Sequence, residues 1–322
     1  MRNGRFNSGK TVVLTSALHF LVDGLCVCGL YLATYPFSTS RLIAVFMTYT
    51  LLAFLTQPLS GAWIDRMQQR HWMLLGALVL LTLGVAATFL SVWLSSPTTG
   101  MFTVAALLGM GNSLFHVWGG QQTALQTDND IRALGVYVST GAFGLAIGTV
   151  FFSWPLLFGF LIAIGVLAVF CIFPSVQEGV DCSPHVRMEM GAGLVWLCII
   201  VLMALVVFRS FVSKDFTAGM AEGQTVILAA GAVSMLGKMA GGFVCSHLGI
   251  VHAMLLVLTA LLFCMLFRQT GMAVQLSGLF LVNCTMPVTL YLANVVLRGR
   301  EGLAFGLLAA ALIPGYLLAT LL

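Results

Sequence analysis

Residues 61–72 read GAWIDRMQQRHW and form a short polar connection between two long apolar runs, residues 42–63 and 72–94. Each run has about the 20 apolar residues that a helix needs to cross the hydrocarbon core of a bilayer. Asp65 lies at the end of the first run, where a carboxylate can meet the N-terminus of a neighbouring helix. These features predict a tight turn between two membrane-spanning helices.

The composition of the whole chain agrees with this interpretation. Of its 322 residues, 60% are hydrophobic and 7% are charged, whereas a soluble domain carries about 25% charged residues. So few charges could not keep the surface of a soluble enzyme in water, and the net charge of +4 is too small for a face that binds nucleic acid. We therefore expect an all-α membrane protein whose surface faces the lipid bilayer.

Apolar runs recur along the entire chain and predict eleven spans. They fall at residues 11–33, 42–63, 72–94, 101–124, 133–152, 154–173, 191–213, 223–246, 251–267, 272–293 and 302–321. The longest connection, residues 174–190, is polar and contains two prolines. We interpret it as a cytoplasmic linker between an N-terminal bundle of six helices, residues 1–173, and a C-terminal bundle of five, residues 191–322.

The basic residues between the runs predict the orientation, because cytoplasmic loops of membrane proteins are enriched in Lys and Arg. With the N-terminus inside, the inner segments hold Arg2, Arg5, Lys10, Arg66, Arg70, Arg132, Arg187, Arg298 and Arg300, and the outer loops hold only Arg41, Lys214 and Arg268. We expect a multi-pass protein of the cell membrane (a bacterial inner membrane or a plasma membrane) with a cytoplasmic N-terminus.

The two halves of the chain contain a weak internal repeat. GAWIDR at residues 61–66 is echoed by GFVCSH at residues 242–247, and the same offset places Gln57 opposite Lys238. A second echo repeats one glycine spacing, in the pairs Gly135 with Gly148 and Gly302 with Gly315. Parallel repeats of this kind are typical of transporters built from two similar bundles.

Several motifs resemble one known family. Gly61, Asp65, Arg66 and Arg70 match G-x-x-x-D-R-x-x-R, the signature between helices two and three of the major facilitator superfamily. ALHFLVDG in the first span, QPLSG in the second, GMGNSLFHVWGG in the fourth and STGAFGLAIG in the fifth are similar to its fosmidomycin-resistance-like branch. The resemblance implies a two-bundle transporter in which the four signature residues act as a conformational latch.

The second half departs from the family pattern in two ways. Ser246 and His247 stand where the repeat of the latch would have an acid and a base. Members of the family normally have twelve helices, and the eleventh apolar run ends at residue 321, so a twelfth helix is expected to be missing.

Few ionisable residues lie deep inside the runs, where a charge costs several kcal/mol unless it has a partner or a wet cavity. Asp23 follows His19 by one helical turn on the same face, and a rise of about 1.5 Å per residue places His116 of the fourth span at the depth of His19. The resemblance implies that the first and fourth spans line a central cavity. We therefore weigh a proton relay through Asp23, His19 and His116 against a structural hydrogen bond between these spans.

Other polar residues within the runs are candidates for substrate binding: Lys238, Gln57, Asn112 and Asn283. Lys238 could attract an anionic substrate or extend its ammonium group to the inner surface, and we leave both open. We expect Arg209 to reach the outer surface in the same way. Gln121 and Gln122 could line an inner vestibule, but we favour a solvated helix end.

These observations favour a secondary active transporter that exports a small organic molecule in exchange for protons by alternating access. An uptake symporter remains open, because these residues do not encode direction, and so does a non-transporting receptor or assembly factor on the same scaffold. The sequence has no Walker loop, no HExxH and no nucleophile–base set, so we expect no enzyme activity, no cofactor and no metal. The expected partners are the substrate, protons and lipid, with no nucleic acid, and the expected state is a monomer.

Overall fold

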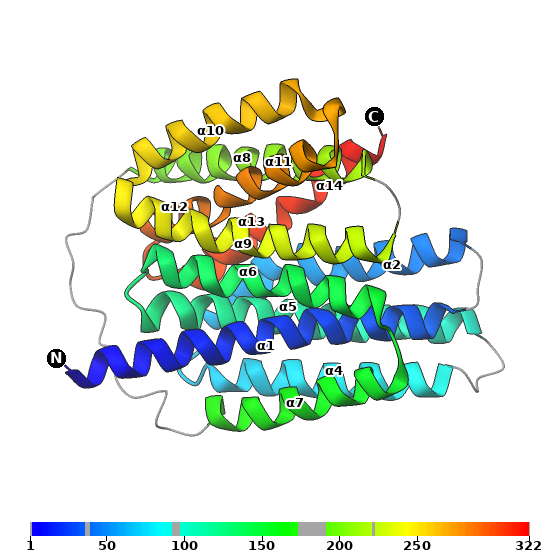
Figure 1. Cartoon of the computed structure of the whole chain (residues 1–322). Helices are drawn as coiled ribbons and strands as arrows, with labels where there is room; N and C mark the ends of the chain where they lie inside the picture. The colour runs from blue at the N-terminus through cyan, green and yellow to red at the C-terminus, as the bar shows by residue number, and fades with distance from the viewer. Residues whose placement is uncertain (1, 36–38, 92–96, 173–190, 221–222, 322) are drawn as a thin grey trace.

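The computed structural model describes residues 2–35, 39–91, 97–172, 191–220 and 223–321, and within them every regular element is helical. The long helices run side by side in one bundle (Figure 1). They are α1 (Arg2–Thr34), α2 (Thr39–Leu55), α3 (Gln57–Ile64), α4 (His71–Ser91), α5 (Pro97–Gln126), α6 (Ile131–Val150), α7 (Trp154–Ile172), α8 (Ala192–Ala218), α9 (Gln224–Leu248), α10 (Ile250–Leu266), α11 (Met272–Cys284), α12 (Met286–Val296), α13 (Glu301–Ala310) and α14 (Leu312–Leu321), with a short 3-10 helix η2 (Arg268–Thr270). The predicted all-α architecture is confirmed.

The predicted spans correspond to these helices in number and order. Among the described residues, ten helical units are long and apolar enough to cross a membrane, and the shorter helix α10 adds an eleventh apolar helix. Three of the ten units consist of two helices each: α2 with α3, α11 with α12, and α13 with α14.

Proline explains why these three units are divided. The breaks at Thr56 and Thr285 each lie two residues before a proline, Pro58 or Pro287, and Pro314 lies in the first turn of α14. A proline ring has no N–H to donate and collides with the carbonyl group one turn earlier. The apolar run continues through each break, so the unit bends without leaving the bundle.

Helix α1 lies in the middle of the first half and packs against α5, α6 and α7. Its close approach to α6 depends on two glycines of α6, because small residues let helix backbones come together. A Cβ atom at Gly144 would collide with the carbonyl oxygen of Phe20, and one at Gly148 would collide with that of Gly24. The glycine-rich sequence of the fifth predicted span therefore serves helix packing.

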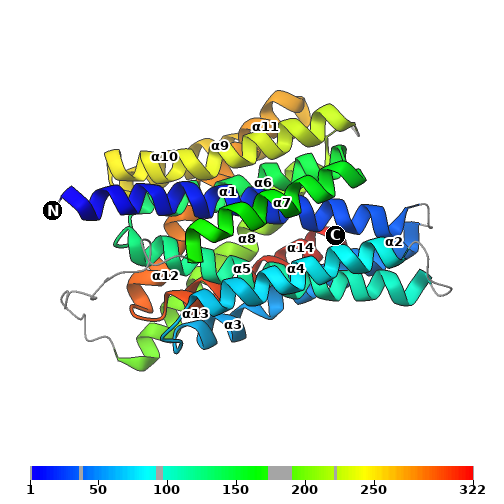
Figure 2. The same ribbon diagram turned by 90° about the horizontal axis from the view of Figure 1, so that it is seen from below.

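The two halves of the chain meet at two glycine junctions that the internal repeat relates. At the first, α3 packs against α13, and a Cβ atom at Gly61 would collide with the backbone of Gly302. At the second, α9 packs against α6, and a Cβ atom at Gly135 would lie 3.4 Å from the Cα atom of Gly242. Both junctions lie toward the end of the bundle where α1 begins (Figure 2). The glycines that echo one another in sequence thus occupy equivalent contacts.

The predicted cytoplasmic linker, residues 174–190, lies outside the described residues. The division into bundles of residues 1–173 and 191–322 therefore stays a prediction.

Candidate functional site

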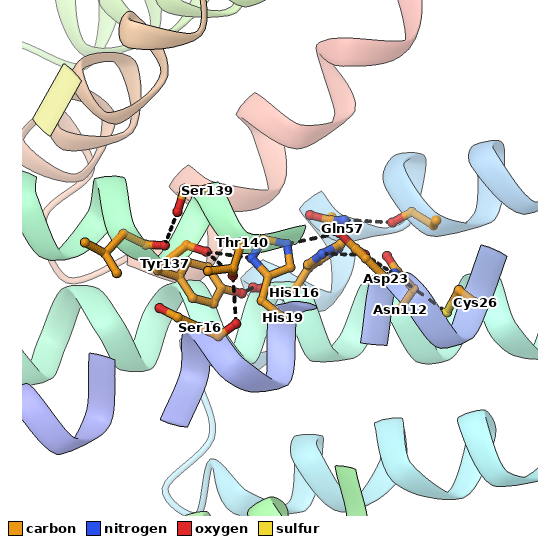
Figure 3. Close-up of polar contacts among 12 residues, drawn as sticks. Ser16, His19, Asp23, Cys26, Gln57, Asn112, His116, Tyr137, Ser139 and Thr140 are labelled. Carbon is orange, nitrogen blue, oxygen red and sulfur yellow. Dashed lines mark hydrogen bonds and ion pairs between the residues drawn. The ribbon is translucent and has the colours of Figure 1, made fainter. Parts of the chain in front are cut away.

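Asp23 lies near the middle of α1 and is 6% exposed. Its Oδ2 atom is 3.3 Å from Nε2 of His19, one turn earlier on the same helix, and its Oδ1 atom is 3.2 Å from Nε2 of His116 on α5. The side-chain amide of Asn112, also on α5, donates to Oδ1 at 2.9 Å. Figure 3 shows these side chains converging on the Asp23 carboxylate. The structure thus brings together the three residues that the sequence predicts as a proton-coupling group.

The other ring nitrogen of His19 fixes the orientation of this imidazole. Nδ1 of His19 lies 2.7 Å from the carbonyl oxygen of Tyr137 on α6, and a carbonyl oxygen can only accept a hydrogen bond. Nδ1 therefore carries a proton and donates it, while Nε2 faces Asp23. A proton between Nε2 and the carboxylate would make this contact a hydrogen bond, and without that proton two lone pairs would face each other.

Tyr137 is a residue of this site that the sequence did not reveal. It is completely buried, and its hydroxyl group donates to the backbone carbonyl of His116 at 2.9 Å. One residue of α6 thus contacts both histidines, one through its backbone and the other through its side chain. Its sequence context, an apolar stretch of the fifth span, gave no signal of this role.

Helix α6 also covers the carboxylate directly. A Cβ atom at Gly141 would collide with Oδ2 of Asp23 and with Nε2 of His19. The site is therefore enclosed by α1, α5 and α6, and glycine at position 141 provides the space that the side chains of Asp23 and His19 occupy.

His19, Asp23 and His116 offer three ligand atoms that lie within 4.8 Å of one another. Two imidazoles and a carboxylate are suitable ligands for Zn²⁺ or another transition metal. The same lone pairs that bind protons could therefore hold a metal ion, and the expected absence of a metal stays a prediction.

The four predicted substrate-binding residues do not form one cluster. Asn112 belongs to the Asp23 site. Gln57 is completely buried and donates to the carbonyl oxygen of Ala53 at 2.8 Å, with no hydrogen-bond partner for its Oε1 atom among the described residues. Their roles in binding stay predictions.

The other two, Asn283 and Lys238, lie in the second half on α11 and α9. Asn283 donates to the carbonyl oxygen of Leu279 at 2.8 Å and lies 3.5 Å from the Ser234 hydroxyl. Lys238 is partly buried on α9. The roles of Asn283 and Lys238 in substrate binding stay predictions.

The predicted latch residue Asp65 joins the two halves at the α3–α13 junction. Its Oδ1 and Oδ2 atoms accept the backbone N–H groups of Gly302 and Leu303 at 2.9 and 2.8 Å, at the start of α13. Helix N-termini have unpaired N–H groups and a partial positive charge, so a carboxylate is favourable there. Burial raises the pKa of Asp65, and the hydrogen bonds from Leu303 and Gly302 oppose that rise.

A residue outside the latch motif, Gln121 of α5, contacts Asp65 and was interpreted wrongly from the sequence. Gln121 was expected at a solvated helix end, but it is 1% exposed and donates to Oδ1 of Asp65 at 2.7 Å. Arg70 is partly buried, and its charge acts on Asp65, whereas Arg66 is exposed. The contact thus depends on Asp65 and Gln121, with Gly61 providing the close approach.

The expectation that Arg209 reaches the surface is also wrong. Arg209 is 6% exposed, because α8 continues to Ala218 and carries the side chain more than two turns inside the helix end. The predicted run ended at residue 213, before the polar residues Lys214 and Asp215, which hid this continuation.

We compared the sequence and the structure of the chain with those of known proteins. No protein-family model matches the sequence, and no curated protein matches it. Solved structures of transporters do match in three dimensions. The human organic anion transporter MFSD10 is 15% identical with a TM-score of 0.67, covering 97% of this chain and 92% of its own.

Two further matches have the same architecture. The major facilitator superfamily transporter FucP, in an outward conformation, is 12% identical with a TM-score of 0.61, covering 96% of this chain and 91% of its own. The nucleoside transporter NupG is 12% identical with a TM-score of 0.55, covering 98% of this chain and 91% of its own. The chain has the fold of the major facilitator superfamily. These matches do not distinguish a branch within it, so the resemblance to the fosmidomycin-resistance-like branch stays a prediction.

Proposed function

We propose that this protein is a secondary active transporter that exchanges protons for a small organic molecule across the cell membrane. The observation that carries the proposal is the buried contact of Asp23 with His19, His116 and Asn112. The fold supports the transporter class, because the solved structures that share it are transporters. Buried ionisable groups in membrane helices commonly form proton pathways.

The proposed coupling follows from the charge that Asp23 carries. Without its proton, the carboxylate is a buried negative charge that His19, His116 and Asn112 surround. A proton bound between Asp23 and His19 neutralises this charge, which lowers the cost of moving the site through the low-dielectric interior. In alternating access, the protein would bind the proton on one side and the cargo on the other.

We assign closure of the transport pathway on one side of the membrane to the latch at Asp65. Asp65 binds the start of α13 while Gly61 packs against Gly302, so the two halves are held together at the end of the bundle where α1 begins. Opening this end requires that the two N–H groups of α13 exchange the carboxylate for water. We propose efflux as the direction, and the same site could serve an uptake symporter.

Proton movement in vesicles tests the proposal. Everted membrane vesicles are loaded with a pH-sensitive fluorophore, and a panel of anionic, neutral and cationic drugs is added in turn. Cargo-induced proton release in the parent protein should vanish in Asp23→Asn, with equal amounts of protein in the membrane. Asp215→Asn is the matched control, because Asp215 pairs with Arg268 at the end of α8 and should keep full coupling.

Two outcomes would contradict the proposal. Normal coupling in Asp23→Asn would exclude the proton relay and leave a structural hydrogen bond. Cargo binding without flux in reconstituted liposomes would favour the alternative, a receptor or assembly factor on this fold.

A further inference from the structure

The carboxylate of Asp23 is a buried group whose neighbours carry no permanent positive charge. Asp23 is 6% exposed, and its ion-pair contacts are with His19 and His116, which are cations only when they are protonated. No lysine or arginine lies within salt-bridge distance of Asp23 in the described part of the chain. Because a carboxylate removed from water strongly favours a cation, a positive ion would stabilise this centre.

Both imidazoles turn their Nε2 atoms toward this carboxylate. Nδ1 of His19 donates to the carbonyl oxygen of Tyr137 at 2.7 Å, so in the neutral ring Nε2 carries the lone pair that faces Asp23. Nε2 of His116 is buried, lies 3.2 Å from Oδ1 of Asp23 and has no hydrogen-bond partner among the described residues. A proton can be shared by only two of these three side chains, whereas a metal ion can bind all three at once.

The spacing of the three side chains fits a metal ion. A tetrahedral Zn²⁺ ion lies about 2.0–2.2 Å from its nitrogen and oxygen ligands, which places neighbouring ligand atoms roughly 3.3–3.6 Å apart. Nε2 of His19 is 3.3 Å from Oδ2 of Asp23, and Nε2 of His116 is 3.2 Å from Oδ1. One ligand atom from each side chain lies within 4.8 Å of the other two. The side chains therefore need only small movements to bind one ion together.

Two neighbouring residues hold these side chains as outer partners hold the ligands of a metal site. A histidine that binds a metal usually donates its other ring N–H to a carbonyl or carboxylate oxygen, and His19 donates in this way to Tyr137. The amide of Asn112 donates to Oδ1 of Asp23 at 2.9 Å. Figure 3 shows both contacts beside the converging side chains. They orient one imidazole and the carboxylate and leave both Nε2 atoms free to bind an ion.

We propose that the Nε2 atoms of His19 and His116 and the carboxylate of Asp23 bind a divalent first-row transition metal ion. Two imidazoles and a carboxylate suit ions such as Zn²⁺ and Co²⁺, whereas Mg²⁺ and Ca²⁺ take oxygen ligands. Three protein ligands leave a fourth position of a tetrahedral ion open to water. The inference goes beyond the proposed transport function and does not depend on it, and it departs from the sequence-based expectation of no metal.

All three ligands belong to the first half of the chain, two on α1 and one on α5, and these two helices pack against each other. The ion would link them without any residue of the second half, so binding requires neither cargo nor contact across the Asp65 junction. The ion and a shared proton use the same atoms and exclude each other. A bound metal ion should therefore stabilise the first half and block proton exchange at Asp23.

Metal binding by the full chain in detergent, purified without a histidine tag, tests the inference. Zn²⁺ should bind with one ion per chain after dialysis and raise the Tm by on the order of 2 °C at ten times its Kd, and Mg²⁺ should do neither. Co²⁺ reports the ligands by its absorption spectrum. It should show the visible bands of a tetrahedral site without the near-ultraviolet band of thiolate ligands, which separates this site from the free cysteines.

His116→Asn separates binding from structure, because Nε2 of His116 makes no hydrogen bond that the variant would lose. It should weaken Zn²⁺ binding by more than about 100-fold, since loss of an outer partner alone costs about 10–100-fold. The control combines His247→Asn and His252→Asn, two exposed histidines at the end of α9 and the start of α10. It should bind Zn²⁺ as the parent does. If His116→Asn does not fold, the Co²⁺ spectrum of the parent decides alone.

The inference fails if the parent binds no Zn²⁺, if Mg²⁺ binds equally well, or if His116→Asn keeps the affinity of the parent. A Co²⁺ spectrum with a thiolate band, or Zn²⁺ binding that is lost in the control, would place the metal elsewhere and also overturn the inference. Failure of metal binding leaves the proton test on Asp23→Asn unaffected. Conversely, normal proton coupling in Asp23→Asn together with Zn²⁺ binding in the parent would overturn the proposed function and keep the metal site.

Discussion

The carboxylate of Asp65 accepts the backbone N–H group of Gly302 at 2.9 Å, across the junction between the two halves of the chain. The repeat-related junction, between α9 and α6, is built differently. Ser246 stands in the position of Asp65, and the start of α6 is capped by Asp130 of its own chain segment, which accepts the N–H group of Arg132 at 2.9 Å. The N–H groups at the start of α13 are thus bound by a carboxylate from the other half, whereas those at the start of α6 are bound by a neighbouring residue. Separating the halves would therefore remove the cap of α13 and leave that of α6 in place.

Asp65→Ala is predicted to open the α3–α13 junction. The substitution removes two hydrogen bonds from a charged acceptor, to Gly302 and Leu303, worth about 1.5–3 kcal/mol each. Amide hydrogen exchange at these two residues should become markedly faster. Asp130→Ala is the control and should accelerate exchange only at the start of α6. Unchanged protection of Gly302 in Asp65→Ala would show that the carboxylate does not hold the junction.

Gln121→Ala is predicted to weaken the same junction by a smaller amount. Gln121 donates to Oδ1 of Asp65 at 2.7 Å and is buried, so its loss leaves the carboxylate with one donor fewer, at about 1 kcal/mol. Exchange at Gly302 should rise less than in Asp65→Ala. The double variant should resemble Asp65→Ala alone, because Gln121 acts through that carboxylate. Additive effects would mean that Gln121 contributes separately.

The spans and part of the candidate site could be predicted from the sequence because they depend on local spacing. Runs of apolar residues determine the spans, and an interval of four residues places His19 and Asp23 on one helical face. His116 was matched to them by depth along its own span. These predictions need only helix geometry and the thickness of a bilayer.

The remaining contacts depend on how distant helices rotate against each other, which one sequence does not encode locally. His19 donates to the backbone carbonyl of Tyr137 only because α6 turns that part of its surface toward α1. Gln121 donates to Asp65 only because α5 turns Gln121 toward the end of α3. Arg209 was misplaced for a different reason: polar residues in the last turn of α8 made the helix look shorter than it is. The contacts of Tyr137 and Gln121 and the burial of Arg209 are therefore structural findings.

Asn112→Leu is predicted to alter proton coupling and leave cargo affinity unchanged. The amide donates to Oδ1 of Asp23 and stabilises the charged carboxylate, so its loss should move the pH profile of transport to higher pH. The initial predicted role of Asn112, in substrate binding, instead requires a higher KM at an unchanged pH profile. Flux measured against cargo concentration at several pH values separates the two.

Gly141→Ala is predicted to disable the Asp23 centre with a single added methyl group. Its Cβ atom would collide with Oδ2 of Asp23 and Nε2 of His19, and these side chains lie in a closely packed interior. Overpacking of this kind costs about 1–3 kcal/mol, so the variant should still fold while its proton exchange falls sharply.

The control for this variant is Gly159→Ala on α7, where an added Cβ atom meets nothing within 4 Å. Alanine is favoured over glycine in a helix by up to about 1 kcal/mol, so this control should be as stable as the parent protein or more so, with full coupling. Proton flux in vesicles and thermal unfolding of the same preparations measure both effects. Equal flux in the two variants would mean that the carboxylate and the imidazole can move apart without consequence, and their contact would then have no part in coupling.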